Sequence, residues 1–122
     1  VEKKDLETFD NIEKYLHQGS MVYFATEKDT LLAGCMVKKE DNNIFEICKL
    51  CSNKNLEHKG AGTSVFKACM DYAINSGAEK IYIISNTKLK AALHIYEKFG
   101  FKKVDLKDTS YERGDIAFEY IP

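Results

Sequence analysis

The chain has 122 residues, a formal net charge of −1 and 44% hydrophobic residues, a composition typical of one globular domain. Acidic and basic residues are mixed along its length, so no basic stripe marks a nucleic-acid-binding surface. No apolar run approaches the roughly 20 residues that span a bilayer, and no signal-peptide pattern opens the chain. We therefore expect a single cytoplasmic domain over residues 1–122 that binds neither nucleic acid nor membrane.

The first half of the chain reads as one helix followed by three strands. Apolar residues recur at three- and four-residue spacing over Asp5 to His17, which predicts a helix, and Gly19 follows as a stop signal. β-forming runs separated by short polar turns then predict an antiparallel meander of three strands, Met21–Thr26, Leu31–Lys38 and Ile44–Cys51.

The second half alternates between helices and strands. A helix is expected over Thr63 to Ser76, and a second one over Leu89 to Phe99, ended by Gly100. The predicted strands are Lys80–Ser85, Phe101–Leu106 and Asp115–Ile121. The resulting order, α-β-β-β-α-β-α-β-β, indicates an α/β or α+β fold with a mixed, mostly antiparallel central sheet and flanking helices.

A Gly-x-Gly pair stands where the third strand gives way to the next helix, in the run His58-Lys59-Gly60-Ala61-Gly62-Thr63-Ser64-Val65. Amides at such a junction point outward beside the positive end of the helix dipole, which suits an anion. The two glycines let the main chain approach a phosphate closely. Taken alone, the pattern is a weak signal, because Gly pairs at helix starts are usually just turns.

Four cysteines raise the question of metal or disulfide chemistry, and Cys48 and Cys51 form a C-x-x-C. On a strand, residues i and i+3 point to opposite faces, and no second C-x-x-C or histidine pair completes a tetrahedral set. We expect no metal site and four reduced, mostly buried thiols, with zinc or a disulfide as the alternatives. The other two cysteines are Cys35 and Cys69.

Three segments form a specific combination: His58-Lys59-Gly60-Ala61-Gly62, Gly77-Ala78-Glu79-Lys80-Ile81-Tyr82-Ile83 and Ile95-Tyr96-Glu97-Lys98-Phe99-Gly100-Phe101. In this order they resemble the GNAT superfamily of acyl-CoA-dependent N-acyltransferases, and the last is similar to its Tyr-Glu-Lys-x-Gly-Phe signature. The resemblance covers about Met21 to Ile121. It implies a GNAT fold and the transfer of an acetyl group from acetyl-CoA to a primary amine by direct attack.

The resemblance also implies a site for acetyl-CoA. Its pyrophosphate would be bound by main-chain amides of His58, Lys59, Gly60, Ala61, Gly62 and Thr63. The main chain of Leu50 to Ser52 would hold the pantetheine arm like an added strand, and the Leu50 amide would stabilise the oxyanion. The side chain of Lys59 either adds a charge or is a surface lysine. Glu57 departs from the family, which usually has Gln or Arg there.

Asn86 is the candidate donor to the amide groups of the cofactor. The family's usual asparagine lies about seven residues before the tyrosine, where this chain has Leu89. Asn86 lies ten before it, and a turn-forming role explains it equally well.

Two residues are candidates for proton transfer. Tyr96 matches the family's tyrosine near the cofactor sulfur, and a phenol, with a pKa of about 10, can protonate a departing thiolate. The alternative is an amphipathic core tyrosine. Glu46 matches the place of a catalytic glutamate in some members, where a carboxylate takes the proton of the attacking amine. It could instead face solvent, with Glu119 or a water chain as the base.

The N-terminal part is short for this family. One predicted helix precedes Met21, where members usually have a strand and two helices that line the acceptor pocket. If Val1 is the native start, the acceptor site is open or is completed by another subunit, as in a homodimer. The rival functions are a non-catalytic acyl-CoA-binding or structural module and an unrelated phosphate-binding domain. The acceptor could be a polyamine, an antibiotic, an amino acid or a protein amine.

Overall fold

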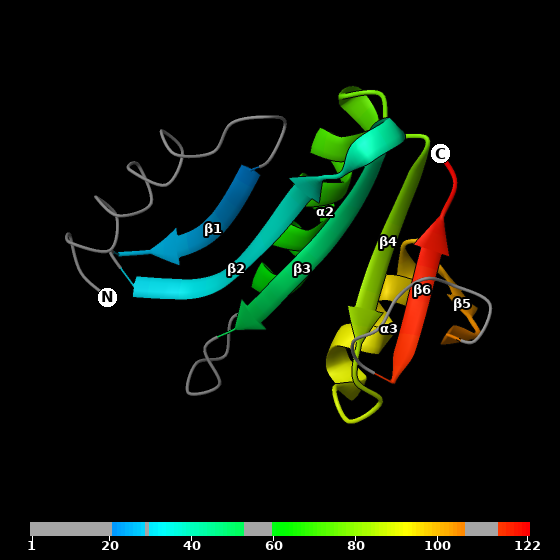
Figure 1. Ribbon diagram of the computed structural model, residues 1–122. Coiled ribbons are helices and arrows are strands. Elements are labelled where there is room, and N and C mark those ends of the chain that lie inside the picture. The colour runs from blue at the N-terminus through cyan, green and yellow to red at the C-terminus, as the bar shows by residue number, and fades with distance from the viewer. Residues whose placement is uncertain (1–20, 29, 53–59, 107–114) are drawn as a thin grey trace.

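The computed structural model describes residues 21–28, 30–52, 60–106 and 115–122, which contain one six-stranded sheet and two α-helices (Figure 1). The strands are β1 (Met21–Glu27), β2 (Thr30–Lys39), β3 (Ile44–Ser52), β4 (Lys80–Ser85), β5 (Lys102–Val104) and β6 (Ile116–Tyr120). The helices are α2 (Ala61–Asn75) and α3 (Lys90–Lys98), and a 3₁₀ helix, η1 (Asp41–Asn43), joins β2 to β3. The predicted helix Asp5–His17 lies outside the described residues.

The strand order in the sheet is β1-β2-β3-β4-β6-β5. Neighbouring strands are antiparallel except β3 and β4, which are parallel. The predicted fold class, a mixed and mostly antiparallel sheet with flanking helices, is therefore confirmed. The assignment of the whole chain to one domain stays a prediction.

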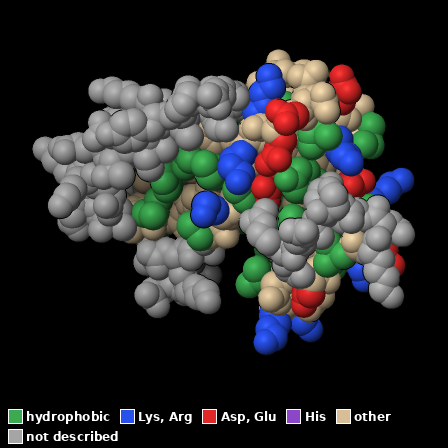
Figure 2. Space-filling view, in the orientation of Figure 1, with side chains coloured by type: hydrophobic (Ala, Val, Ile, Leu, Met, Phe, Trp, Pro, Cys, Tyr) green, Lys and Arg blue, Asp and Glu red, His purple; other side chains and the backbone are tan. Residues whose placement is uncertain are grey.

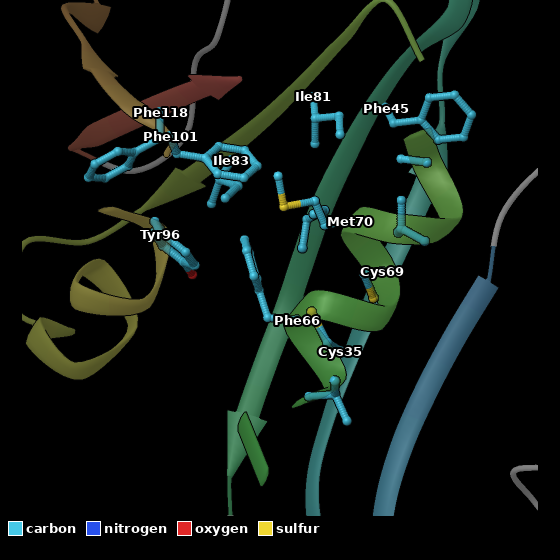
Figure 3. Packing of buried hydrophobic residues seen from close by; sticks show 14 of the residues in the cluster. Cys35, Phe45, Phe66, Cys69, Met70, Ile81, Ile83, Tyr96, Phe101 and Phe118 are labelled. Carbon is cyan, nitrogen blue, oxygen red and sulfur yellow. The ribbon is translucent and has the colours of Figure 1, made fainter. Parts of the chain in front are cut away.

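Both helices cover the same face of the sheet (Figures 1 and 3). The buried residues of α2 recur at three- and four-residue spacing, and this side of the helix packs against β1, β2 and β3. The helix α3 joins this core through aromatic rings, because the Phe66 ring lies 5.3 Å from Tyr96 and 5.4 Å from Phe99. Neither described helix is long and apolar enough to cross a membrane.

Two predicted elements, the helix after the Gly pair and the strand after Gly100, differ from the structure by more than one residue at one end. The helix after the Gly pair begins at Ala61 rather than Thr63, because Gly60 takes a left-handed conformation (φ +92°) and its carbonyl accepts the first helical bond from Ser64 N at 2.8 Å. The strand β5 has three residues rather than the six predicted. Phe101 is buried and its amide donates to the Tyr96 carbonyl at 3.1 Å, so it still belongs to the end of α3.

A β-bulge interrupts the pairing of β2 with β3. Gly34 lies opposite Cys51 and Met36 lies opposite Cys48, so one residue of β2 faces two residues of β3. Lys49, within the bulge, has φ +56°. Since Gly34 and Met36 share a face of the sheet, their partners share it as well. The prediction that the two cysteines of the C-x-x-C point to opposite faces is therefore wrong, because the extra residue shifts the alternation.

All four cysteines are free thiols. Cys35 and Cys69 are buried as expected and Cys48 is half-buried, but Cys51 is exposed. A hydrogen bond with Cys35 and burial raise the pKa of Cys69, and burial and the nearby Glu46 raise that of Cys48 to about 11. Within the described part of the chain, no three potential ligands gather at one point to hold a metal ion.

The strands β3 and β4 pair over only three residues each. Ile44, Phe45 and Glu46 lie beside Lys80, Ile81 and Tyr82. Beyond Glu46 the strands diverge, as Figure 1 shows, and the bulge in β3 follows between Cys48 and Cys51. On the side toward β4, the main chain of residues 47–52 has no partner among the described strands.

Candidate active site

A groove of about 590 Å³ lies where β3, α2 and α3 meet. It is lined by the end of β3, the first turn of α2 and the segment that leads into α3. The lining residues are Leu50, Cys51, Gly62, Lys88, Leu89, Lys90, Ala91, Ala92 and Ile95. The groove thus has an apolar floor with two lysines beside it, which suits an elongated ligand that carries negative charge.

The N-terminus of α2 faces this groove through Gly62. The first amides of a helix have no partner within it, and the helix dipole makes this end positive. Among the described residues no side chain caps the helix, and its first turn contains no acidic residue. The geometry at Gly60 to Thr63 is that of a helix N-terminus beside a groove, and its role as an anion site stays a prediction. His58 and Lys59, like Glu57, lie outside the described residues.

The unpaired edge of β3 also borders the groove. Leu50 is half-buried and lines it, and the Ser52 main chain still pairs with Ala33 of β2 on the other side. The main-chain groups of this segment that face β4 are open to an extended ligand. This is the arrangement that the resemblance to GNAT proteins implied for the pantetheine arm, and the roles of Leu50 and Ser52 stay predictions.

Tyr96 lies in the core at the level where β3 and β4 diverge. It is buried, and its ring lies 5.5 Å from that of Phe118, which sits beside Ile83 of β4 in the sheet register. Figure 3 shows the ring beside Phe66. Burial raises the pKa of Tyr96 to about 12, while the Ser85 hydroxyl opposes that rise. The phenol is therefore protonated throughout the neutral range.

Glu46 occupies the last rung at which β3 and β4 pair, beside Tyr82. Its side chain is only 2% exposed, so it is not the solvent-facing glutamate that was the alternative. The Tyr82 phenol donates to Glu46 Oε1 at 3.4 Å, and Lys38 Nζ lies 3.6 Å from the same oxygen. The other candidate base, Glu119, pairs beside Tyr82 and accepts a hydrogen bond from Lys80 Nζ at 3.3 Å.

Glu46 and Tyr96 lie on opposite faces of the sheet. Ile81 and Ile83 face the helices, so Tyr82 between them, and Glu46 beside it, face the other way. Figure 2 shows that face, on which acidic and basic side chains gather over the central strands. A molecule that passes between the diverging strands would reach both groups.

Similarity to known proteins decides the family. The chain matches the sequence model of the acetyltransferase (GNAT) family over residues 2–101. The chain belongs to the acetyltransferase (GNAT) family. The spermidine N(1)-acetyltransferase of Escherichia coli K12 is 29% identical over 99 residues, which are 79% of this chain and 53% of that enzyme. The chain thus spans about half the length of this relative.

GNAT proteins of known structure share the fold. A GNAT acetyltransferase from Staphylococcus aureus Mu50 superposes with a TM-score of 0.78 at 17% identity, covering 99% of this chain and 80% of that one. The PaiA N-acetyltransferase of Thermoplasma acidophilum, in complex with coenzyme A, gives 0.72 at 18% identity, covering 98% and 70%. At these identities the likeness shows the fold alone.

Asn86 stabilises the turn between β4 and α3. Its Oδ1 accepts a hydrogen bond from Lys88 N at 2.8 Å, and its carbonyl accepts one from Leu89 N at 2.9 Å. It does not line the groove, whereas Leu89, at the position of the asparagine that GNAT proteins usually carry, does. Its cofactor role stays a prediction, and the turn-forming alternative is present in the structure.

Reasoning from the sequence missed the groove wall from residue 88 to 95. The signal was present, because Ala91, Ala92 and Ile95 form a small apolar patch at helical spacing directly after the β4 strand. No role was predicted for Lys88 or Lys90, which line the same groove as Gly62 of α2 because of how α3 packs.

Proposed function

We propose that this GNAT chain is an N-acetyltransferase that uses acetyl-CoA as acyl donor and a primary amine as acceptor. One observation carries the proposal: β3 and β4 diverge beyond Glu46 beside a groove that meets the positive end of α2. An unpaired strand edge can bind an extended pantetheine arm, and the helix end can bind its pyrophosphate.

The described residues divide the chemistry between the two faces of the sheet. On the face away from the two described helices Glu46, or a water that it activates, takes the proton of the amine as its nitrogen attacks the thioester carbon. The Leu50 amide stabilises the oxyanion. On the helix face Tyr96 donates its proton to the departing sulfur. Holding both substrates in one geometry supplies much of the rate.

The acceptor class rests on similarity. The E. coli relative is named for spermidine, and a Schizosaccharomyces pombe relative, 26% identical over 88% of this chain and 75% of its own length, is an N-alpha-acetyltransferase. Both names denote acetylation of an amine, so we propose that this chain acetylates a primary amine of a small molecule or a protein.

Location and assembly are further parts of the proposal. Four free thiols favour a reducing compartment, and we place the protein in the cytoplasm. We also propose a homodimer.

Two measurements test the function. Calorimetric titration with acetyl-CoA should give saturable one-site binding, and a thiol-release assay should show turnover with a panel of spermidine, lysine, an aminoglycoside and a peptide with a free N-terminus. Binding without turnover of any amine would favour the alternative, a non-catalytic acyl-CoA-binding module. The ion pair of Glu46 with Lys38 is the feature that favours that alternative, because it occupies the candidate base. Failure to bind acetyl-CoA would reject both.

A further inference from the structure

One buried hydroxyl in the core, that of Ser85, has no hydrogen-bond partner among the described residues. Ser85 is the last residue of β4 and is 8% exposed. Burying a hydroxyl without a partner lowers stability, so such a group in a native fold calls for a reason.

The position of Ser85 in the sheet gives a reason for this buried hydroxyl. Side chains alternate along β4, so Ser85 shares with Ile83 the face that the helices cover. Ile83 lies beside Phe118, and the Phe118 ring packs against that of Tyr96. On the β3 side, pairing ends at Glu46, three rungs earlier, so no described strand covers Ser85 there. The Ser85 side chain is also close enough to Tyr96 to act on its phenol, so the two hydroxyls are neighbours at the divergence of the strands.

Ser85 affects the pKa of the Tyr96 phenol. Burial raises the pKa of Tyr96 to about 12, Cys35 and Cys48 raise it further, and Ser85 is the neighbour that lowers it. A free thiol ionises at about pH 8.5, so a phenol this weak gives up its proton to a thiolate only reluctantly. A hydroxyl that stabilises the phenolate makes the transfer easier.

We propose that Ser85 is a positioning residue for acetyl transfer, whose hydroxyl donates a hydrogen bond to the phenolic oxygen of Tyr96 as Tyr96 gives up its proton. This inference rests on the proposed function. In the step, the O–H bond of Tyr96 breaks and an S–H bond forms on the leaving coenzyme A. The negative charge moves from the sulfur to the phenolic oxygen, where the Ser85 O–H stabilises it. Ser85 contacts neither the amine nor the thioester, so it acts through Tyr96.

A double-variant cycle tests this on the full chain, with acetyl-CoA and the amine of the panel that is turned over fastest. Ser85→Ala should lower kcat about tenfold, the equivalent of about one pKa unit, and leave the KM for acetyl-CoA unchanged. Added to Tyr96→Phe, it should change kcat by less than about twofold, because the group that it serves is gone. An equal loss in both backgrounds, or a change confined to KM, would overturn the proposal.

A second readout does not depend on turnover. The full chain is prepared with 3,5-difluorotyrosine at position 96, and its ionisation is followed by ¹⁹F NMR with and without Ser85→Ala. The apparent pKa should be higher in the variant, and no difference would overturn the pairing even in an active transferase. A difference in a protein that turns over no amine supports the pairing and counts against the proposed function alone.

Stability separates this role from a structural one. Ser85→Ala removes an unpartnered hydroxyl, so its Tm should equal or exceed that of the native chain while kcat falls. A lower Tm would show that the fold uses the hydroxyl and would overturn the proposal. Ser85→Thr, which keeps the hydroxyl, should restore most of kcat. Ser76→Ala, at the exposed end of α2, is the matched control and should change neither readout.

Discussion

Glu46 and Tyr82 are joined across the last paired rung of β3 and β4, where the Tyr82 phenol donates a hydrogen bond to Glu46 Oε1 at 3.4 Å. Beyond this rung the strands separate. The Tyr82 hydroxyl thus ties the carboxylate to β4 at the point where the opening begins, and Lys38 holds the same oxygen from β2. The candidate base is placed by three strands at once.

Replacing Glu46 by Gln tests the base role. We expect kcat to fall at least 100-fold, in the range usual for a lost general base, with the dissociation constant of acetyl-CoA unchanged. Steady-state kinetics and calorimetry measure the two quantities. The matched control is Glu119→Gln on β6. If Glu119→Gln lowers kcat and Glu46→Gln does not, the base is Glu119 and the role assigned to Glu46 is wrong.

Replacing Tyr96 by Phe tests the acid role. The ring and its contacts with Phe66 and Phe118 remain, so only the phenolic proton is lost. We expect kcat to fall about 100-fold and affinity for acetyl-CoA to stay the same, with a residual rate due to proximity. An unchanged kcat would leave Tyr96 as a core residue, which was the alternative inferred from its helix face.

The raised pKa of Tyr96 also predicts an alkaline loss of stability. Below pH 10 the phenol is protonated in both the folded and the unfolded chain, so its stabilising effect is complete. Between pH 10 and about 12 the unfolded state ionises and the folded state does not, so the free energy of unfolding falls, by up to about 3 kcal/mol. In urea unfolding at pH 8, 10 and 11, the free energy of unfolding should fall less with pH for Tyr96→Phe than for the native chain. The Cys48 thiol titrates in both proteins, so its part cancels. An equal fall of the free energy of unfolding in both proteins would contradict the raised pKa of Tyr96.

Gly60 and Gly62 should respond differently to alanine. Gly60 has φ +92°, so Gly60→Ala should lower the free energy of unfolding by about 1–2 kcal/mol although its Cβ would meet nothing within 4 Å. Gly62 lies inside α2, where alanine favours the helix by up to about 1 kcal/mol. Its Cβ would enter the groove, so Gly62→Ala should weaken acetyl-CoA binding without loss of stability. Denaturant titration and calorimetry measure both, and undiminished affinity in Gly62→Ala would contradict the placement of the ligand.

Cys51 offers a labelling test of the groove. It is exposed and lines the groove, whereas Cys35 and Cys69 are buried. A water-soluble disulfide reagent should modify Cys51 first, and saturating acetyl-CoA should slow that reaction because the ligand covers the thiol. Mass spectrometry of the labelled chain identifies the site, and Cys51→Ser is the control that should remove the fast phase. Labelling that acetyl-CoA does not affect would place the ligand elsewhere.

Much of the fold follows from local sequence. Hydrophobic periodicity and turn residues placed β1 to β4 within one residue at each end, because alternation and helical spacing are properties of neighbouring residues. The Gly60 turn was predictable for the same reason, since glycine readily adopts a positive φ. The signature around Tyr96 then identified the family.

The site itself depends on contacts between distant segments. The bulge at Lys49 exists only in the register with β2, and it reverses the faces that strict alternation assigns to Cys48 and Cys51. Likewise, a predicted strand does not show where its partner ends. The separation of β3 from β4 after Glu46 was therefore not predictable.

Local chemistry was thus enough to specify the elements, the Gly60 turn and the candidate proton donors. Packing decides the surroundings of these residues. It buries Glu46 against Tyr82, places Tyr96 on the other face of the sheet and leaves the Ser85 hydroxyl with no hydrogen-bond partner in the described part of the chain. The reason is physical. Burial and hydrogen-bond partners are set by segments far apart in the chain, as for Glu46 and Tyr82, 36 residues apart, whereas backbone preference is set by neighbours.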